Sequence, residues 1–230
     1  MTPLEAYELE QGSQRWREAR CGLVTASRCA DVVATIKKGK EEAASRRNYR
    51  EQLISEILTG QPAEQYVTRE MQWGADQEQF ARAAYELERD VLVETCGFVL
   101  HPGIPRFGCS PDGLVGEDGL IQIKCPTTAT HLSWILARTI PVEHCPQMLA
   151  EMSCTGRAWC DFVSYDPRLP KHLQLFIRRF TCAPGLIEAL EANVEYFNAE
   201  IDAVLAQLPT EGPQLIVKAI ESGRADELEF

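Results

Sequence analysis

A short segment near the middle of the chain places an acidic, an amide and a basic side chain at spacings that suit phosphodiester chemistry. Gln122 and Lys124 follow Asp112 by ten and twelve residues. Successive side chains of a strand point to opposite faces of a sheet. We therefore expect Gln122 and Lys124 on one face of a strand, with Ile121 and Ile123 on the other face.

A tight turn is predicted to bring Asp112 beside this strand. Asp118 and Gly119 form an Asp-Gly pair, which is typical of β-hairpins. Such a hairpin would gather Asp112, Gln122 and Lys124 into one cluster. Carboxylates can hold Mg²⁺, and a nearby lysine can position an attacking water or neutralise developing charge. From residue types alone, the alternative is a set of polar residues on the exposed side of a hairpin.

The elements around this hairpin are predicted to form a layered α/β domain, because strands sit between helical blocks. Apolar residues at helical spacing and short apolar runs between turn residues separate the two types. Helices are predicted at 27–37, 45–58, 69–87, 131–137, 143–153 and 184–208, and strands at 91–100, 107–109, 114–115, 120–125, 158–165 and 173–180. We expect a single domain over 1–230, with 209–230 as a C-terminal extension.

The charge distribution excludes a protein that coats nucleic acid without regard to sequence. The formal net charge is −11, whereas phosphate binding relies on Lys and Arg. Six basic residues nevertheless gather between positions 37 and 50, against two acidic ones, while 186–230 carries ten acidic and two basic residues. The basic segment is either a lip that guides a polyanion or a solvated face. Its members are Lys37, Lys38, Lys40, Arg46, Arg47 and Arg50.

Cysteine usage and hydropathy predict a soluble, cytoplasmic protein. The nine cysteines contain no CxxC pair and are odd in number, so they indicate neither a zinc ribbon nor a complete disulfide framework. We expect reduced thiols. No apolar stretch approaches the roughly 20 residues that a membrane span needs, so no membrane association is expected. The chain also lacks the glycine patterns of nucleotide-binding loops and the G-x-S-x-G pattern of hydrolases.

The spacing PD-x9-(E/Q)-x-K resembles the signature of the PD-(D/E)XK nucleases. The surrounding CSPDGL and IKCP segments resemble the lambda-phage exonuclease branch, the YqaJ-type viral recombinases or alkaline exonucleases. The resemblance covers roughly residues 15 to 205 and implies an α/β fold with a central mixed β-sheet flanked by helices. Its other motifs are RxGxVTAS at 20–27, Trp73-Gly74 followed by Glu78, Gln147, and YDPR at 165–168.

The resemblance also implies a role for each matching residue. Asp112, Glu78 and the main-chain carbonyl of Ile123 would bind metal, as would the side chain at position 122. Lys124 would serve the attacking water, and Gln147 would orient the site. Arg20, Ser27 and Ser110 would hold phosphates, with Arg20 suited to a terminal 5′-phosphate through a forked contact. Met71 would be an apolar wedge at the last base pair.

Position 122 departs from the family pattern, which has glutamate there. Glutamine leaves two carboxylates, Glu78 and Asp112, to bind two Mg²⁺ ions, and a neutral amide oxygen is a poorer ligand for a hard cation. We expect weakened turnover, because a loss of about 2.7 kcal/mol would slow the reaction roughly a hundredfold. The substitution would be engineered to hold intact DNA or, as the alternative, natural.

The resemblance implies a Mg²⁺-dependent 5′-to-3′ exonuclease that acts on linear duplex DNA and leaves 3′ overhangs for recombination. Mn²⁺ would be able to replace Mg²⁺. Expected partners are double-stranded DNA ends, two further copies in a ring-shaped homotrimer, and a single-strand annealing protein, in a bacterial host of a phage or prophage. The alternatives are an endonuclease or resolvase-like relative on the same fold, and a non-catalytic scaffold that binds DNA ends.

Overall fold

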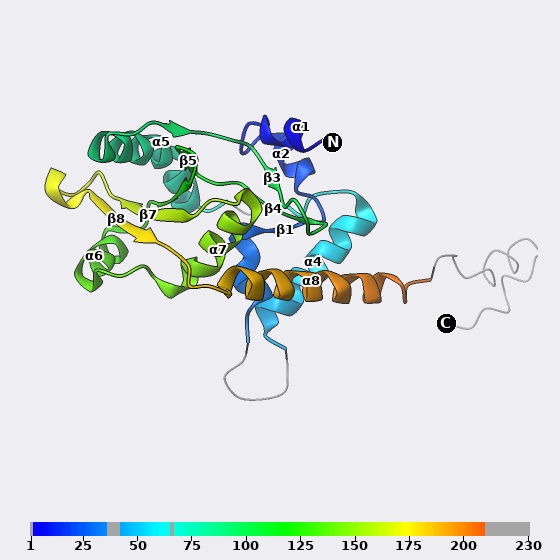
Figure 1. Cartoon of the computed structure of the whole chain (residues 1–230). Helices are drawn as coiled ribbons and strands as arrows, with labels where there is room; N and C mark the ends of the chain where they lie inside the picture. Colours follow the sequence, from blue (N-terminus) through cyan, green and yellow to red (C-terminus); the bar gives the residue numbers. More distant parts are fainter. Residues whose placement is uncertain (1, 36–41, 65–66, 210–230) are drawn as a thin grey trace, which may run out of the picture.

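Two β-sheets and eight α-helices make up the part of the chain that the computed structural model describes, residues 2–35, 42–64 and 67–209 (Figure 1). The five-stranded sheet has the order β2-β5-β6-β7-β8, and the three-stranded sheet has the order β1-β4-β3. The strands are β1 (Val24–Thr25), β2 (Val93–Glu94), β3 (Val99–Leu100), β4 (Phe107–Cys109), β5 (Gly113–Val115), β6 (Gly119–Lys124), β7 (Trp159–Tyr165) and β8 (Leu175–Phe180). The helices are α1 (Pro3–Tyr7), α2 (Gln14–Ala19), α3 (Cys29–Val32), α4 (Ala44–Thr59), α5 (Arg69–Arg89), α6 (Thr128–Ala137), α7 (Cys145–Thr155) and α8 (Leu186–Leu205).

The larger sheet is mixed, as the family resemblance implies. β6 and β7 are parallel, and the other three pairs are antiparallel. The predicted hairpin is confirmed, since Gly113 pairs with Ile121 and Val115 with Gly119. Gly119 is also needed for packing, because a Cβ there would lie 2.1 Å from the ring of Trp159.

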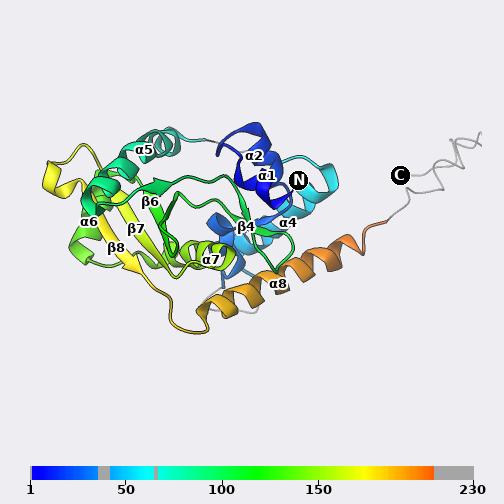
Figure 2. The ribbon, with the colours of Figure 1, turned by 45° about the horizontal axis from the view of Figure 1, so that its top comes forward.

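Helices cover both faces of this sheet (Figure 2). Tyr85 of α5 packs against Ile121 and Ile123 on one face. Met148 and Met152 of α7 pack against Leu120 and Phe162, and α6 contributes Trp134 and Ile135 on the same side. Alternation along β6 therefore directs Leu120, Gln122 and Lys124 toward α7, which confirms the predicted division of the strand into two faces.

A third apolar cluster joins the smaller sheet to the N-terminal helices and to α8. Phe107 of β4, Tyr49 of α4 and Phe197 of α8 are among its buried members. Tyr49 and Phe197 stack with ring centroids 5.7 Å apart. In Figure 1, α8 and α4 lie side by side along the lower edge of the molecule. Helix α7 contributes Ala150 and Cys154 to this cluster, so α7 lies between the two sheets.

The predicted strand 91–100 is wrong as a single element. β2 pairs with β5 in the larger sheet, whereas β3 pairs with β4 in the smaller one. Between them, the backbone nitrogens of Gly97 and Phe98 donate to the carbonyls of Tyr7 and Ala6, two residues of α1. The segment crosses from one sheet to the other because these distant carbonyls satisfy its backbone.

Other differences concern the ends and the short elements. The described part of the predicted helix 27–37 contains a 3-10 turn, Ala26–Arg28, and the short α3. The predicted helix 143–153 starts as a 3-10 turn at Val142–His144 before α7. Short elements such as α1, α2 and β1 were not predicted, because their few residues carry little periodicity. All nine cysteines are free. Within the described ranges, no helix has the length and apolar character needed to span a membrane.

Candidate active site

Asp112, Gln122 and Ile123 form one hydrogen-bonded unit at the hairpin. The side-chain amide of Gln122 donates to Asp112 Oδ2 at 2.8 Å, and the backbone nitrogen of Ile123 donates to the same oxygen at 2.6 Å. A carboxylate only accepts hydrogen bonds, so the NH₂ group of Gln122 faces Asp112 and its oxygen faces away. That Oε1 atom is buried and has no hydrogen-bond partner among the described residues.

A second unit connects β6 to α7. Lys124 Nζ donates to Gln147 Oε1 at 3.4 Å, and Gln147 Nε2 donates to Glu151 Oε1 at 2.9 Å. Glu151 is 0% exposed, and its Oε2 atom has no partner within the described part of the chain. Sequence reasoning missed Glu151. Its position one helical turn after Gln147, on the same face of α7, is the signal that could have identified it.

A third unit ties α5 to the hairpin. Arg82 donates to Glu78 Oε1 at 2.7 Å, and two of its nitrogens donate to the carbonyl oxygen of Asp112 at 3.1 and 3.2 Å. Glu78 is thereby held beside Asp112 although the two residues come from different elements. Arg82 was not predicted, because its partner Asp112 lies thirty residues further along the chain.

Burial raises the pKa of all three carboxyl groups in these units, and Asp112 further raises the pKa of the other two. Burial, followed by the nearby Asp112, raises the pKa of Glu78 to about 7. Burial raises the pKa of Asp112, against the opposing charge of Lys124. The same two causes that act on Glu78 raise the pKa of Glu151 well above its ordinary value. A cation placed among these groups would offset both the repulsion and the desolvation.

The donor chemistry of the site suits a hard divalent cation. Carboxylate, amide and main-chain carbonyl oxygens are preferred by Mg²⁺, and two buried oxygens, Gln122 Oε1 and Glu151 Oε2, lack a hydrogen-bond donor among the described residues. The side chains as they stand do not form a group of three or more His, Cys, Asp and Glu residues that could hold a metal ion, counted over the described ranges. The fit of the site to Mg²⁺ therefore rests on the types of its oxygen donors, and not on ligands that are already arranged around a metal position.

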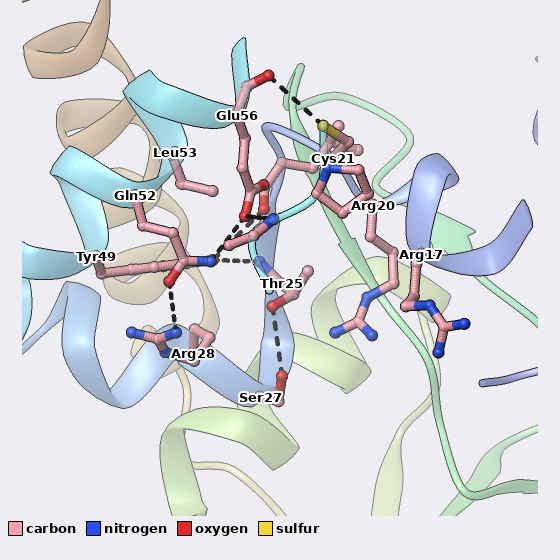
Figure 3. Close-up of a pocket in the computed structure, with 13 residues that line it drawn as sticks. Arg17, Arg20, Cys21, Thr25, Ser27, Arg28, Tyr49, Gln52, Leu53 and Glu56 are labelled. Atoms are coloured by element: carbon pink, nitrogen blue, oxygen red, sulfur yellow. Dashed lines mark hydrogen bonds between the residues drawn. The ribbon is translucent and has the colours of Figure 1, made fainter. Parts of the chain in front are cut away.

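A pocket of about 100 Å³ lies beside α2 and α4 (Figure 3). Arg17 and Arg20 lie on one side of it and Arg28 on the other, with the hydroxyls of Thr25 and Ser27 between them. Glu56 also lines the pocket, but its oxygens already accept hydrogen bonds from neighbouring groups, the backbone nitrogen of Gly22 among them. The pocket is therefore rich in donors that suit an anion.

Trp16 connects this pocket to the hairpin. The guanidinium of Arg20 stacks over the Trp16 ring, 3.8 Å from its centroid, while its Nε atom is buried and has no partner within the described ranges. Burial lowers the pKa of Arg20 from its ordinary high value. Trp16 Nε1 donates to Ser110 Oγ at 2.9 Å, two residues before Asp112. Trp16, which was not predicted, thus contacts both Arg20 and Ser110, while Ser27 lines the same pocket as Arg20.

The remaining predicted residues lie apart from these units. Met71 is exposed in the first turns of α5. The guanidinium of Arg168 lies 4.3 Å from the ring centroid of Trp73, and Arg168 also pairs with the buried Asp166. Lys37, Lys38 and Lys40 lie outside the described residues, as does most of the C-terminal extension.

The mixed sheet, the covering helices and the hairpin site define the class of protein: an α/β protein with the PD-(D/E)XK nuclease fold. The model of the YqaJ-like viral recombinase domain matches residues 15–158. The crystal structure of LHK-Exo in complex with dAMP is 43% identical, with a TM-score of 0.78, and the match covers 91% of this chain and 100% of that chain. A second crystal structure, of the alkaline exonuclease LHK-Exo from Laribacter hongkongensis, gives a TM-score of 0.77 at the same identity and coverage. This chain belongs to the YqaJ-like viral recombinase family.

Two further similarities carry less weight. A phage-related exonuclease from Haemophilus somnus 129PT is 13% identical, with a TM-score of 0.61 over 81% of this chain and 96% of that chain, which supports the fold alone. A segment of 111 residues is 22% identical to NACHT, LRR and PYD domains-containing protein 2 of Homo sapiens. It covers 48% of this chain and only 10% of that protein, so we draw no function from it.

Proposed function

We propose that this protein is a Mg²⁺-dependent 5′-to-3′ exonuclease that degrades one strand of linear duplex DNA and leaves 3′ overhangs. The observation that carries the proposal is the Trp16 Nε1 to Ser110 Oγ hydrogen bond, which links a donor-rich pocket to the Asp112 hairpin. An anion held in the pocket would then fix the position of the adjoining phosphodiester. Binding of dAMP by LHK-Exo supports a nucleotide product.

The residues divide the work according to their contacts. Glu78 and Asp112 would hold Mg²⁺ with the carbonyl of Ile123 and the side chain at position 122, and Mn²⁺ would be able to replace it. Bound metal polarises the phosphodiester and lowers the pKa of its water. Lys124, held by Gln147, would position the attacking water or neutralise the charge that develops on the phosphate.

The pocket would recognise the 5′ end. Arg20 offers a forked guanidinium, which suits the two oxygens of a terminal phosphate, and its Nε atom has no partner among the residues that the structure describes. Ser27 and Ser110 would add hydroxyl donors, and the exposed Met71 would contact the last base pair. Lys37, Lys38 and Lys40 would guide the duplex by charge.

Release of mononucleotides from linear, 5′-phosphorylated duplex DNA in the presence of Mg²⁺ tests this function. We expect a label at the 5′ end of the degraded strand to be released first and a label at its 3′ end to be released last. Asp112→Asn should abolish release. Cleavage of a covalently closed circle would identify an endonuclease or resolvase-like relative instead. Tight binding of DNA ends without release, in this chain and in Gln122→Glu alike, would identify a non-catalytic scaffold.

Three further parts of the proposal come from family membership. We expect a homotrimeric ring around DNA, whose inner surface would present basic residues of this acidic protein, and an interaction with a single-strand annealing protein in the bacterial cytoplasm. Size-exclusion chromatography with light scattering tests the trimer. The weakened turnover expected from Gln122 stays a prediction, and it depends on whether another carboxylate replaces the lost charge.

A further inference from the structure

Glu151 is a fully buried carboxyl group on α7. It is 0% exposed and forms no ion pair with any described residue, and its Oε2 atom has no hydrogen-bond partner there. Its other oxygen accepts only the amide of Gln147, at 2.9 Å. Burying a carboxyl group without a partner is costly in free energy. A bound cation would offset this cost.

The position of Glu151 on α7 directs it toward the hairpin. Met148 and Met152 pack against the larger sheet, whereas Ala150 and Cys154 pack against the cluster around β4. Gln147 and Glu151 form the stripe between these two contacts. Gln122 and Lys124 extend from β6 toward the same helix, because they share the face of Leu120. Glu151 thus approaches the site from the side opposite α5.

Gln122 is the other buried group with an oxygen left over. Its amide nitrogen is engaged by Asp112, while its Oε1 atom has no donor among the described residues. Two buried oxygens without donors, one from β6 and one from α7, therefore lie on the same side of the sheet. A bound cation would satisfy both of them.

We propose that Glu151 supplies, from α7, the metal-binding carboxylate that position 122 on β6 lacks. The inference rests on the proposed metal-dependent function. With Glu78 and Asp112 it would bring three negative charges to a bound ion, although within the described ranges these side chains do not form a metal-binding group before the ion is present. Gln122 then contributes a neutral oxygen and holds Asp112 in place, so its presence does not by itself weaken the enzyme.

A purely structural role for Glu151 makes different predictions. As a neutral acid it could donate a hydrogen bond within the protein, for example to Gln122 Oε1. Replacing it by glutamine would then change stability equally with and without metal. As a metal ligand, Glu151 should instead lower the stability of the protein when a chelator removes the metal, and raise it when a divalent ion is bound.

The experiment compares four chains: the unmodified chain, Glu151→Gln, Gln122→Glu, and the double variant that carries both changes. Mn²⁺ affinity is measured by electron paramagnetic resonance and calorimetry, and melting temperature is measured in EDTA and in Mg²⁺. We expect Glu151→Gln to weaken Mn²⁺ binding at least about tenfold, or about 1.4 kcal/mol. The double variant, which moves the carboxylate back to β6, should recover most of that loss. Met152→Leu, a neighbouring substitution of similar volume, should leave affinity unchanged.

If Glu151→Gln binds Mn²⁺ as tightly as the unmodified chain does, the inference is overturned. If Glu151→Gln does not fold, the double variant provides the test. Mn²⁺ affinity there that is close to that of the unmodified chain and weaker than that of Gln122→Glu alone would support Glu151 as a ligand, and affinity equal to that of Gln122→Glu alone would refute it. Because binding is measured without DNA, metal binding that depends on Glu151 but comes without nucleotide release would refute the exonuclease and not this inference.

Discussion

The side-chain amide of Gln122 donates a hydrogen bond to Asp112 Oδ2 at 2.8 Å. Glutamate at this position could not donate that bond, because an ionised carboxylate only accepts. Gln122 therefore stabilises Asp112 through a hydrogen bond that an ionised glutamate at this position could not provide.

Gln122→Glu should destabilise the metal-free protein. The substitution removes a buried hydrogen bond and places a second carboxylate against Asp112, which we expect to cost about 1–3 kcal/mol. Thermal denaturation in EDTA measures the loss, and added Mg²⁺ should recover much of it. An unchanged melting temperature in EDTA would mean that the bond contributes little.

Arg20→Lys should reduce the preference for 5′-phosphorylated ends. Lysine keeps the charge but loses the fork and the flat surface that stacks over Trp16. The ratio of initial rates on phosphorylated and hydroxyl-ended duplexes should fall by about tenfold, or about 1.4 kcal/mol. Arg15→Lys, an exposed change on the same helix, is the matched control and should keep the ratio.

Trp16→Phe separates two contacts of one residue. Phenylalanine retains a ring under Arg20 but cannot donate to Ser110. We expect the apparent affinity for 5′-phosphorylated ends to persist while kcat falls, because the pocket is no longer tied to the hairpin. Trp16→Ala should lower both. Equal losses in the two variants would argue against a positioning role for the indole nitrogen.

Arg82→Lys should lower activity more than stability. Arg82 bridges Glu78 and the Asp112 carbonyl with three hydrogen bonds, and a lysine ammonium cannot reproduce the fork. We expect a drop in kcat of about tenfold, or about 1.4 kcal/mol, with a small change in melting temperature. Arg89→Lys at the end of the same helix is the control.

Tyr85→Phe should change stability and leave metal binding intact. Tyr85 donates to the fully buried Asp161 at 2.8 Å on the face of the sheet that α5 covers, and Arg179 also binds Asp161 with two nitrogens. Loss of the hydroxyl should cost about 1 kcal/mol. Urea denaturation checks the cost, and an equal loss of Mn²⁺ affinity would show that this network extends to the site.

Local patterns predicted most of the elements near the site. The Asp-Gly pair at 118–119 and the period of two in β6 are properties of neighbouring residues, so they correctly indicated the hairpin and the common face of Gln122 and Lys124. The prediction of a single strand at 91–100 was wrong because its division depends on α1, far away in the sequence. Resemblance supplied Glu78 and Gln147, whose lone positions on helices carry no such signal.

The sequence by itself determined the hairpin and the spacing of Asp112, Gln122 and Lys124, since each depends on residues within one or two elements. Only the tertiary structure buried Glu151, placed Arg82 between Glu78 and Asp112, and placed Trp16 between Arg20 of the pocket and Ser110. These contacts join residues from separate elements, and the packing of α2, α5 and α7 decides which polar atoms are buried and which find partners. Burial and hydrogen-bond satisfaction are properties of the whole fold. The sequence alone therefore did not reveal the buried carboxyl group of Glu151.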